Sequence, residues 1–137
     1  MCEKKIDSLE TVNMYIDQIH YIIDHHGEIV LIKKRKSENN RPLLYTNLGT
    51  LNDLYPDDNI IEMIKIALYS LDAKDYLYTT TDRQRKNQPP LLVFGKKIKI
   101  QDVYIKIRIG ILENRIKVLS FHYALYSINS KDYPYLE

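Results

Sequence analysis

The sequence is poor in the residues that several common functional classes require. Its 137 residues include 1 Cys, 4 Gly and no Trp. The lone cysteine, Cys2, can form neither an internal disulfide nor a cysteine-based metal site. The glycines are widely spread, so no glycine-rich loop is available to bind phosphate, and no G-x-S-x-G motif is present. These absences exclude a disulfide-stabilised scaffold, a P-loop protein and a hydrolase with a nucleophile elbow.

Long hydrophobic runs are absent as well. No apolar stretch approaches the length of about 20 residues that crosses a bilayer, and the N-terminal MCEKK leads into a polar segment rather than a signal peptide. The composition, 45% hydrophobic and 28% charged, is typical of a folded soluble protein. We therefore expect a cytoplasmic protein with one domain over residues 1–137, a frayed N-terminus, an extended tail at residues 127–137 that can be mobile, and no contact with membranes.

The net charge is only +2, but the charges are unevenly distributed. Residues 1–81 hold 9 Lys/Arg and 13 Asp/Glu, residues 82–108 hold 8 Lys/Arg and 2 Asp, and residues 109–137 hold three of each sign. A basic segment on a nearly neutral chain favours a localised anionic partner such as RNA, although a solvated charged face would have the same composition. The 12 Tyr residues fit base stacking and also the edge of a small core.

The spacing of apolar residues predicts helices in the first half of the chain and strands in the second. The predicted elements are a helix over 7–26 stopped by Gly27, a strand over 28–34, a loop over 35–42, a short helix around 47–54, a helix from 56–59 to 71–72, a long polar loop over 73–90, and strands over 91–94, 101–111 and 115–123 with turns at 95–97 and 112–114. Helices followed by closely spaced strands predict an α+β fold with a small antiparallel sheet backed by two main helices.

The sharpest local pattern is the alternation over residues 103–111. Val103, Ile105, Ile107, Ile109 and Ile111 share one face of this strand, while Tyr104, Lys106 and Arg108 share the other, about 7 Å apart along the strand. Two cations and a phenol in a row can bind phosphate, move a proton or stack on a base. An ordinary solvated strand face would show the same alternation.

The last predicted strand ends in Ser120-Phe121-His122. A histidine titrates near neutral pH and can give or take a proton in phosphoryl chemistry. A histidine at a strand end is more often a capping or packing residue, but pairing of the two strands can bring His122 close to Tyr104. The other three histidines have no partners at metal-ligand spacing, so we exclude a zinc site.

Several short motifs occur in a fixed order: Asp75-Tyr76, Asp82, Val93-Phe94-Gly95-Lys96, Val103-Tyr104-Ile105-Lys106-Ile107, Leu119-Ser120-Phe121-His122 and Tyr133-Pro134. This order resembles the MqsR-like toxins of bacterial toxin–antitoxin systems. With the first helix, Gly27 and the Leu48-Gly49 pair upstream, the resemblance covers roughly residues 16–123 in outline. The Val-Tyr-Ile-Lys and Ser-Phe-His elements are its most specific parts.

The resemblance implies a RelE-like fold and a metal-independent endoribonuclease that cuts mRNA and is held inactive by an antitoxin encoded nearby. By position it places Tyr104 and His122 at the functional centre. This chain departs from the best-known members at three places. They have a Lys at the position of His122, a Gln near the position of Leu91 and a Lys near the position of Tyr78.

The sequence thus predicts a ribonuclease toxin without cofactor or metal. Its catalytic residues would be His122, Tyr104 and Lys106, and its RNA-binding residues Arg83, Lys96, Lys97, Arg108 and Tyr78. Two other functions fit the same composition. One is a protein-binding inhibitor or immunity module of a mobile element without catalysis, since Tyr and Arg also anchor protein interfaces. The other is an RNA-binding protein that does not cleave its ligand.

Overall fold

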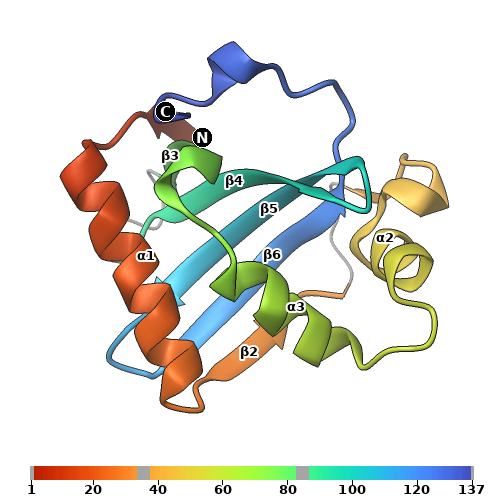
Figure 1. Cartoon of the computed structure of the whole chain (residues 1–137), viewed down its shortest axis with the longest axis horizontal. Coiled ribbons are helices and arrows are strands. Elements are labelled where there is room, and N and C mark those ends of the chain that lie inside the picture. Colours follow the sequence, from red (N-terminus) through yellow and green to blue (C-terminus); the bar gives the residue numbers. More distant parts are fainter. Residues whose placement is uncertain (1, 34–37, 83–86, 137) are drawn as a thin grey trace.

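A six-stranded sheet runs through the molecule, with helices against one of its faces (Figure 1). The computed structural model describes residues 2–33, 38–82 and 87–136. The elements in this part of the chain are β1 (Cys2–Lys5), α1 (Leu9–Asp24), β2 (Glu28–Leu31), the 3-10 helix η2 (Leu43–Tyr45), α2 (Asn47–Leu54), α3 (Ile60–Tyr69), η3 (Ala73–Asp75), β3 (Tyr76–Asp82), β4 (Leu91–Ile98), β5 (Gln101–Gly110), β6 (Arg115–Tyr123) and η5 (Ser130–Asp132).

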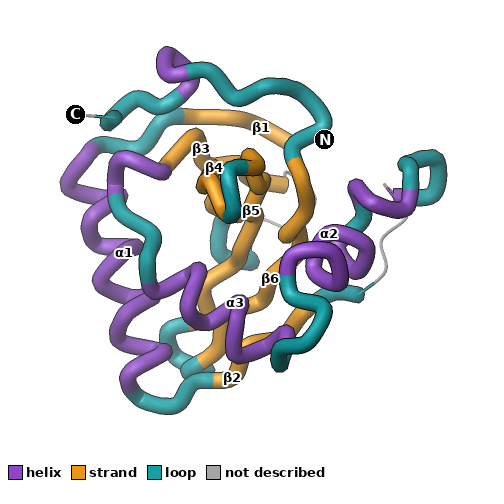
Figure 2. Tube along the Cα trace, turned by 45° about the vertical axis from the view of Figure 1, so that its right-hand side comes forward, coloured by secondary structure: helices purple, strands orange, loops and turns teal. Residues whose placement is uncertain are grey.

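The strand order is β1-β3-β4-β5-β6-β2. Every neighbouring pair is antiparallel except β2 and β6, which are parallel. The prediction of an α+β fold with an antiparallel sheet is therefore confirmed, with one parallel edge strand added. The two main helices, α1 and α3, cross the sheet, and the short helix predicted around 47–54 is α2, which Figure 2 shows beside β6.

Helix α1 lies within the helix predicted over 7–26 and is two residues shorter at each end. The Ser8 hydroxyl accepts a hydrogen bond from the Thr11 N–H at 3.2 Å, which satisfies a backbone donor of the first turn. At the other end Gly27 donates from its N–H to Ile22 O at 2.7 Å. A Cβ at position 27 would lie 2.2 Å from Ile22 Cγ2. Only glycine therefore fits this close turn into β2.

The core lies between the helices and one face of the sheet. Val103, Ile105 and Ile107 of β5 are fully buried against α1-side residues such as Ile16 and Ile19. The alternation predicted for this strand is confirmed, because each intervening residue points to the opposite face. Burial of these branched side chains supplies about 1.5–3 kcal/mol each relative to exposure.

Two segments expected to be irregular are strands. The predicted loop over 73–90 contains η3 and β3, and the predicted frayed N-terminus is β1, which pairs with β3 in register Lys5↔Thr79. The physical reason lies in the composition of Tyr76-Leu77-Tyr78-Thr79-Thr80-Thr81, since aromatic and β-branched residues favour extended backbone even when the segment is polar. The loop prediction gave polarity too much weight.

Turns and strand ends differ in detail from the prediction. The turn predicted at 95–97 lies at Lys99-Ile100, whose φ angles are 50° and 67°, so β4 continues to Ile98. A two-residue turn with positive φ at both positions matches the twist of the strands it joins. Ile111, assigned by alternation to the buried face, lies beyond β5 in the next turn and is exposed. β2 ends at Leu31, three residues earlier than expected.

The C-terminal segment returns across the sheet to the N-terminal region (Figure 1). The Tyr135 hydroxyl donates to Asp7 O at 2.5 Å, and the Tyr135 ring stacks on Tyr76 with centroids 6.2 Å apart. The residues after β1, the start of β3 and the C-terminal segment at Tyr135 therefore contact one another. None of the helices in the described ranges has the length and apolar character needed to cross a membrane.

Candidate functional site

A cavity of about 850 Å³ lies on the polar side of β5 and β6, opposite the core. Its walls come from β1, β3, β5, β6 and the C-terminal segment. The lining residues are Lys4, Lys5, Ile6, Arg41, Leu77, Tyr78, Tyr104, Lys106, Ser120, His122, Ala124, Leu125, Tyr126, Ser127, Ile128, Lys131 and Asp132. Four residues predicted from the sequence, Tyr78, Tyr104, Lys106 and His122, thus share one cavity.

A β-bulge in β6 puts His122 on this face. Lys106 pairs with Ser120, but the next residue of β5, Ile107, pairs with Val118, so Leu119 has no counterpart. An extra residue in one strand exchanges the faces of the side chains that follow it. Before the bulge the even-numbered Val118 is in the core, and after it the even-numbered Ser120 and His122 line the cavity.

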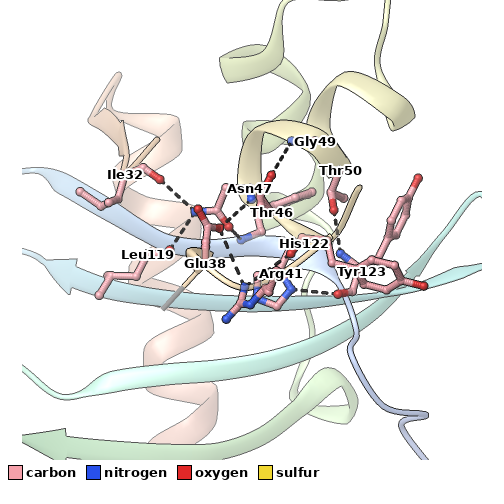
Figure 3. A network of polar contacts seen from close by, with 12 residues as sticks. Ile32, Glu38, Arg41, Thr46, Asn47, Gly49, Thr50, Leu119, His122 and Tyr123 are labelled. Carbon is pink, nitrogen blue, oxygen red and sulfur yellow. Dashed lines mark hydrogen bonds and ion pairs between the residues drawn. The ribbon is translucent and has the colours of Figure 1, made fainter. Parts of the chain in front are cut away.

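His122 faces Tyr104 directly across the strand pair. Their rings stack with centroids 5.3 Å apart and an interplanar angle of 21°. The His122 Nδ1 lies 2.8 Å from Tyr123 O (Figure 3). Because a carbonyl oxygen can only accept, Nδ1 carries the proton, and a neutral ring then keeps its basic lone pair on Nε2. The side chain is only 3% exposed, so its position is well defined by packing.

Two phenols and two ammonium groups extend this pair. The hydroxyls of Tyr78 and Tyr104 are 2.9 Å apart and share a hydrogen bond. Lys106 Nζ lies 5.8 Å from the centre of the Tyr104 ring, and Lys4 Nζ lies 4.5 Å from the centre of the Tyr78 ring. Each lysine can thus stabilise negative charge near a phenol that is able to donate a proton.

The lining residues carry an excess of positive charge. Five cations, Lys4, Lys5, Arg41, Lys106 and Lys131, line the cavity with one carboxylate, Asp132. Two of the five also have carboxylate partners outside the lining: Lys5 pairs with Asp7 at 3.5 Å and Arg41 with Glu38 at 3.9 Å. A cavity with walls of one charge concentrates the field and attracts ions of the opposite sign. The charge of these walls therefore favours anionic groups over cationic ones.

Gly95 allows the C-terminal segment to close one side of the cavity. Gly95 pairs with Tyr104 across β4 and β5. A Cβ at position 95 would lie 2.5 Å from the Tyr133 hydroxyl and 3.0 Å from Ile128 Cδ1. Burial, with Asp102, Asp75 and Asp132 nearby, raises the pKa of Tyr133 to about 12. The Tyr133 phenol therefore stays neutral where it touches the sheet.

The other predicted site residues lie away from the cavity or outside the described ranges. Lys96 Nζ pairs with Asp75 at 3.3 Å, Lys97 Nζ with Asp102 at 3.1 Å, and Arg108 Nε donates to Pro89 O at 3.0 Å. None of these three cations is among the cavity-lining residues. Arg83 falls outside the residues that the structure describes. Their role in RNA binding stays a prediction.

The cavity also contains residues that sequence reasoning missed as site residues: Lys4, Lys5, Arg41, Ser120 and Lys131. Ser120 belonged to the Ser-Phe-His motif and could have been placed by the change of phase in β6. The four cations lie far from residues 82–108 in the sequence. Only the pairing of β1 with β3 and the path of the C-terminal segment bring Lys4, Lys5 and Lys131 together.

No group of three or more His, Cys, Asp or Glu side chains that could hold a metal ion occurs in the described part of the chain. Comparisons with models of known protein families, with curated proteins and with solved structures found no match to this chain. The fold and the site define an α+β protein with a cation-lined cavity that holds a stacked tyrosine–histidine pair.

Proposed function

We propose that this protein is a metal-independent endoribonuclease that cuts RNA by attack of a 2′-hydroxyl on the adjacent phosphorus. One observation carries the proposal: His122 and Tyr104 are stacked at 5.3 Å inside a cavity lined by five cations. Proton-transfer groups beside an anion-binding surface are what phosphoryl transfer without a metal requires.

The chemistry needs one base and one acid and no further reactant. His122 accepts the 2′-hydroxyl proton at Nε2 while the 2′-oxygen forms its bond to phosphorus. The bond from phosphorus to the 5′-oxygen breaks, and the hydrogen-bonded phenols of Tyr104 and Tyr78 return a proton to that oxygen. Lys106 and Arg41 stabilise the charge of the pentavalent transition state from the cavity wall. The products are a 2′,3′-cyclic phosphate and a 5′-hydroxyl.

The resemblance to MqsR-like toxins extends this proposal to biology. A RelE-like toxin would act on mRNA in the cytoplasm and would be restrained by an antitoxin encoded beside it. The Val-Tyr-Ile-Lys strand and the Ser-Phe-His element support this assignment, because both supply residues to the cavity. The substitution of His122 for the Lys of the family is chemically compatible, since both side chains can transfer a proton.

The decisive experiment is cleavage of a short labelled RNA by the purified protein, with a chelator present. We expect fragments that end in a 2′,3′-cyclic phosphate and begin with a 5′-hydroxyl. The same oligonucleotide with 2′-deoxyribose at the cut position is the matched control, and we expect it to stay intact. Cutting of the deoxy substrate, or fragments with a 5′-phosphate, would contradict the mechanism.

A protein-binding module is the second candidate, and one observation favours it. Leu43, Leu44 and Leu48 are 80%, 44% and 38% exposed, and apolar residues that are close in sequence and exposed are typical of protein contacts. Expression in bacteria separates the two functions. A toxin arrests growth and is relieved by the neighbouring gene, whereas an inhibitor does neither and leaves RNA uncut.

A further inference from the structure

Asn47, the first residue of α2, makes more hydrogen bonds than its position in a short helix explains. It is fully buried. Its Nδ2 donates to Ile32 O and to Leu119 O, both at 2.9 Å, and its Oδ1 accepts from the Phe121 N–H at 3.0 Å (Figure 3). The three bonds reach two different segments of the sheet from one side chain.

The bonds to Leu119 and Phe121 enclose the β-bulge. Strand β2 pairs with β6 only as far as Leu31↔Val118, and Ile32 N–H donates to Val118 O at 3.0 Å. Beyond that point Asn47 takes the place of a neighbouring strand. It binds the backbone of the bulged residue and of the residue that precedes His122. Leaving a buried backbone group without a hydrogen bond costs free energy, so these bonds favour the bulged register over a regular one.

The same residue reaches a second cavity-lining residue, Arg41, through its backbone. Its N–H donates to Glu38 Oε2 at 2.8 Å. Glu38 is itself buried, and Arg41 Nη1 lies 3.9 Å from the same Oε2. The Arg41 side chain is only 17% exposed and lines the cavity. Asn47 is therefore linked through its side chain to the backbone beside His122 and through its backbone N–H and Glu38 to Arg41.

We propose that Asn47 is the positioning residue of this site. Its amide fixes the β6 bulge and hence the face on which His122 lies. Its backbone N–H orients Glu38, which holds Arg41 at the cavity wall. Loss of the amide removes the bonds that favour the bulge, and a regular register would send Ser120 and His122 to the opposite face. The consequences for RNA rest on the proposed ribonuclease function, whereas the placement of His122 does not.

The test reads the His122 ring directly in the full-length protein. Nitrogen-15 NMR of histidine-labelled protein reports which ring nitrogen carries the proton and the pH at which the ring titrates. His20, His25 and His26 serve as internal references. Asn47→Asp keeps the shape and an acceptor oxygen but loses both donated bonds, and Asn47→Ala loses all three. Asn47→Ser keeps a small polar group and is the variant to use if the other two do not fold.

Leu51→Ala is the matched control, because it removes a fully buried side chain from the same helix without touching a hydrogen bond to β6. We expect the Asn47 variants to move the His122 titration midpoint by about half a pH unit or more and to weaken the signal of Nδ1 protonation. Leu51→Ala should lower stability and leave both His122 signals in place. Unmoved His122 signals in a folded Asn47→Ala protein would overturn the proposal.

Kinetics add a second, independent readout. The Asn47 variants retain the backbone N–H that holds Glu38, so kcat should fall about tenfold or more while KM for RNA stays close to that of the wild type. Glu38→Gln weakens the support of Arg41, which acts on the transition state, so kcat should fall here too, but the His122 signals should stay unchanged. If the wild type does not cut RNA, the ribonuclease proposal fails while the NMR result still decides the role of Asn47. If RNA is cut but His122 is unmoved, only the positioning proposal fails.

Discussion

The two faces of the β5–β6 hairpin differ in their contacts: one packs apolar side chains into the core, and the other presents polar side chains to the cavity. On the core face Val103, Ile105 and Phe121 are fully buried among apolar neighbours, and any well-fitting apolar residue would serve there. On the cavity face His122 is also buried but polar, and it stacks on Tyr104. Burying polar groups costs free energy unless they are hydrogen-bonded. His122 meets this requirement through the bond of its Nδ1 to Tyr123 O at 2.8 Å, so polar contacts as well as packing determine the residues of the cavity face.

Removing His122 should have the largest effect on activity. We expect His122→Ala to lower RNA cleavage about 10²–10⁴-fold, because a proton-transfer group is lost. The free energy of unfolding should fall less than for a core truncation, because the ring borders the cavity. The measurement is single-turnover cleavage of a labelled RNA. His20→Ala is the matched control, since that ring contacts Tyr69 O on the opposite side of the sheet at 2.9 Å. Equal activity of both variants would remove His122 from the mechanism.

Phe121, which precedes His122 and lies on the core face, should matter for stability instead. Phe121→Ala is expected to lower the free energy of unfolding by about 3–5 kcal/mol, because it leaves a cavity among fully buried residues. Urea denaturation measures this loss, and Ile105→Val, expected at about 0.5–1.5 kcal/mol, calibrates the same face. A His122→Ala protein destabilised as strongly as Phe121→Ala would contradict the contrast between the faces.

A smaller effect is expected at the pair of phenols. Tyr104→Phe keeps the ring stacked on His122 but loses the hydroxyl that lies 2.9 Å from that of Tyr78. We expect about a tenfold loss of kcat, consistent with one lost hydrogen bond that matters in the transition state. Tyr78→Phe and the double variant complete a cycle. If the two hydroxyls act as a unit, the double variant is no slower than Tyr104→Phe.

The cations should separate into two groups. Lys131→Ala removes a cavity-lining charge, and we expect it to weaken single-stranded RNA binding and to reduce the salt-dependence slope by about 0.7. Lys97→Ala removes a cation that already pairs with Asp102 at 3.1 Å outside the cavity, so its effect should be smaller. Binding titrations at several salt concentrations measure both. A larger effect at Lys97 would restore the basic segment 82–108 as the RNA-binding region.

The sequence predicts these two faces unequally. The strict alternation of β5 was enough to assign both of its faces, and the phase change in β6 is visible in the sequence, because Val118 and Leu119 are consecutive apolar residues. The charge pattern was a poorer guide. Residues 82–108 have the largest excess of cations, yet of the described ones only Lys106 lines the cavity. Lys4 and Lys131 reach it through tertiary contacts, which local sequence cannot specify.

The contact of Tyr133 with the sheet at Gly95, on the cavity face, should weaken at alkaline pH. Because burial and nearby carboxylates raise the Tyr133 pKa to about 12, the folded state keeps a proton that the unfolded state loses near pH 10. Stability from this contact is therefore complete below pH 10 and declines as the pH rises toward 12. Urea midpoints from pH 8 to 11.5 should fall less steeply for Tyr133→Phe than for the wild type.

The difference should be modest, because burial raises the pKa of Tyr76 in the same way. Tyr126→Phe, whose ring is 85% exposed, is the control. An equally steep decline in Tyr133→Phe would show that this phenol does not hold the C-terminal segment against the sheet.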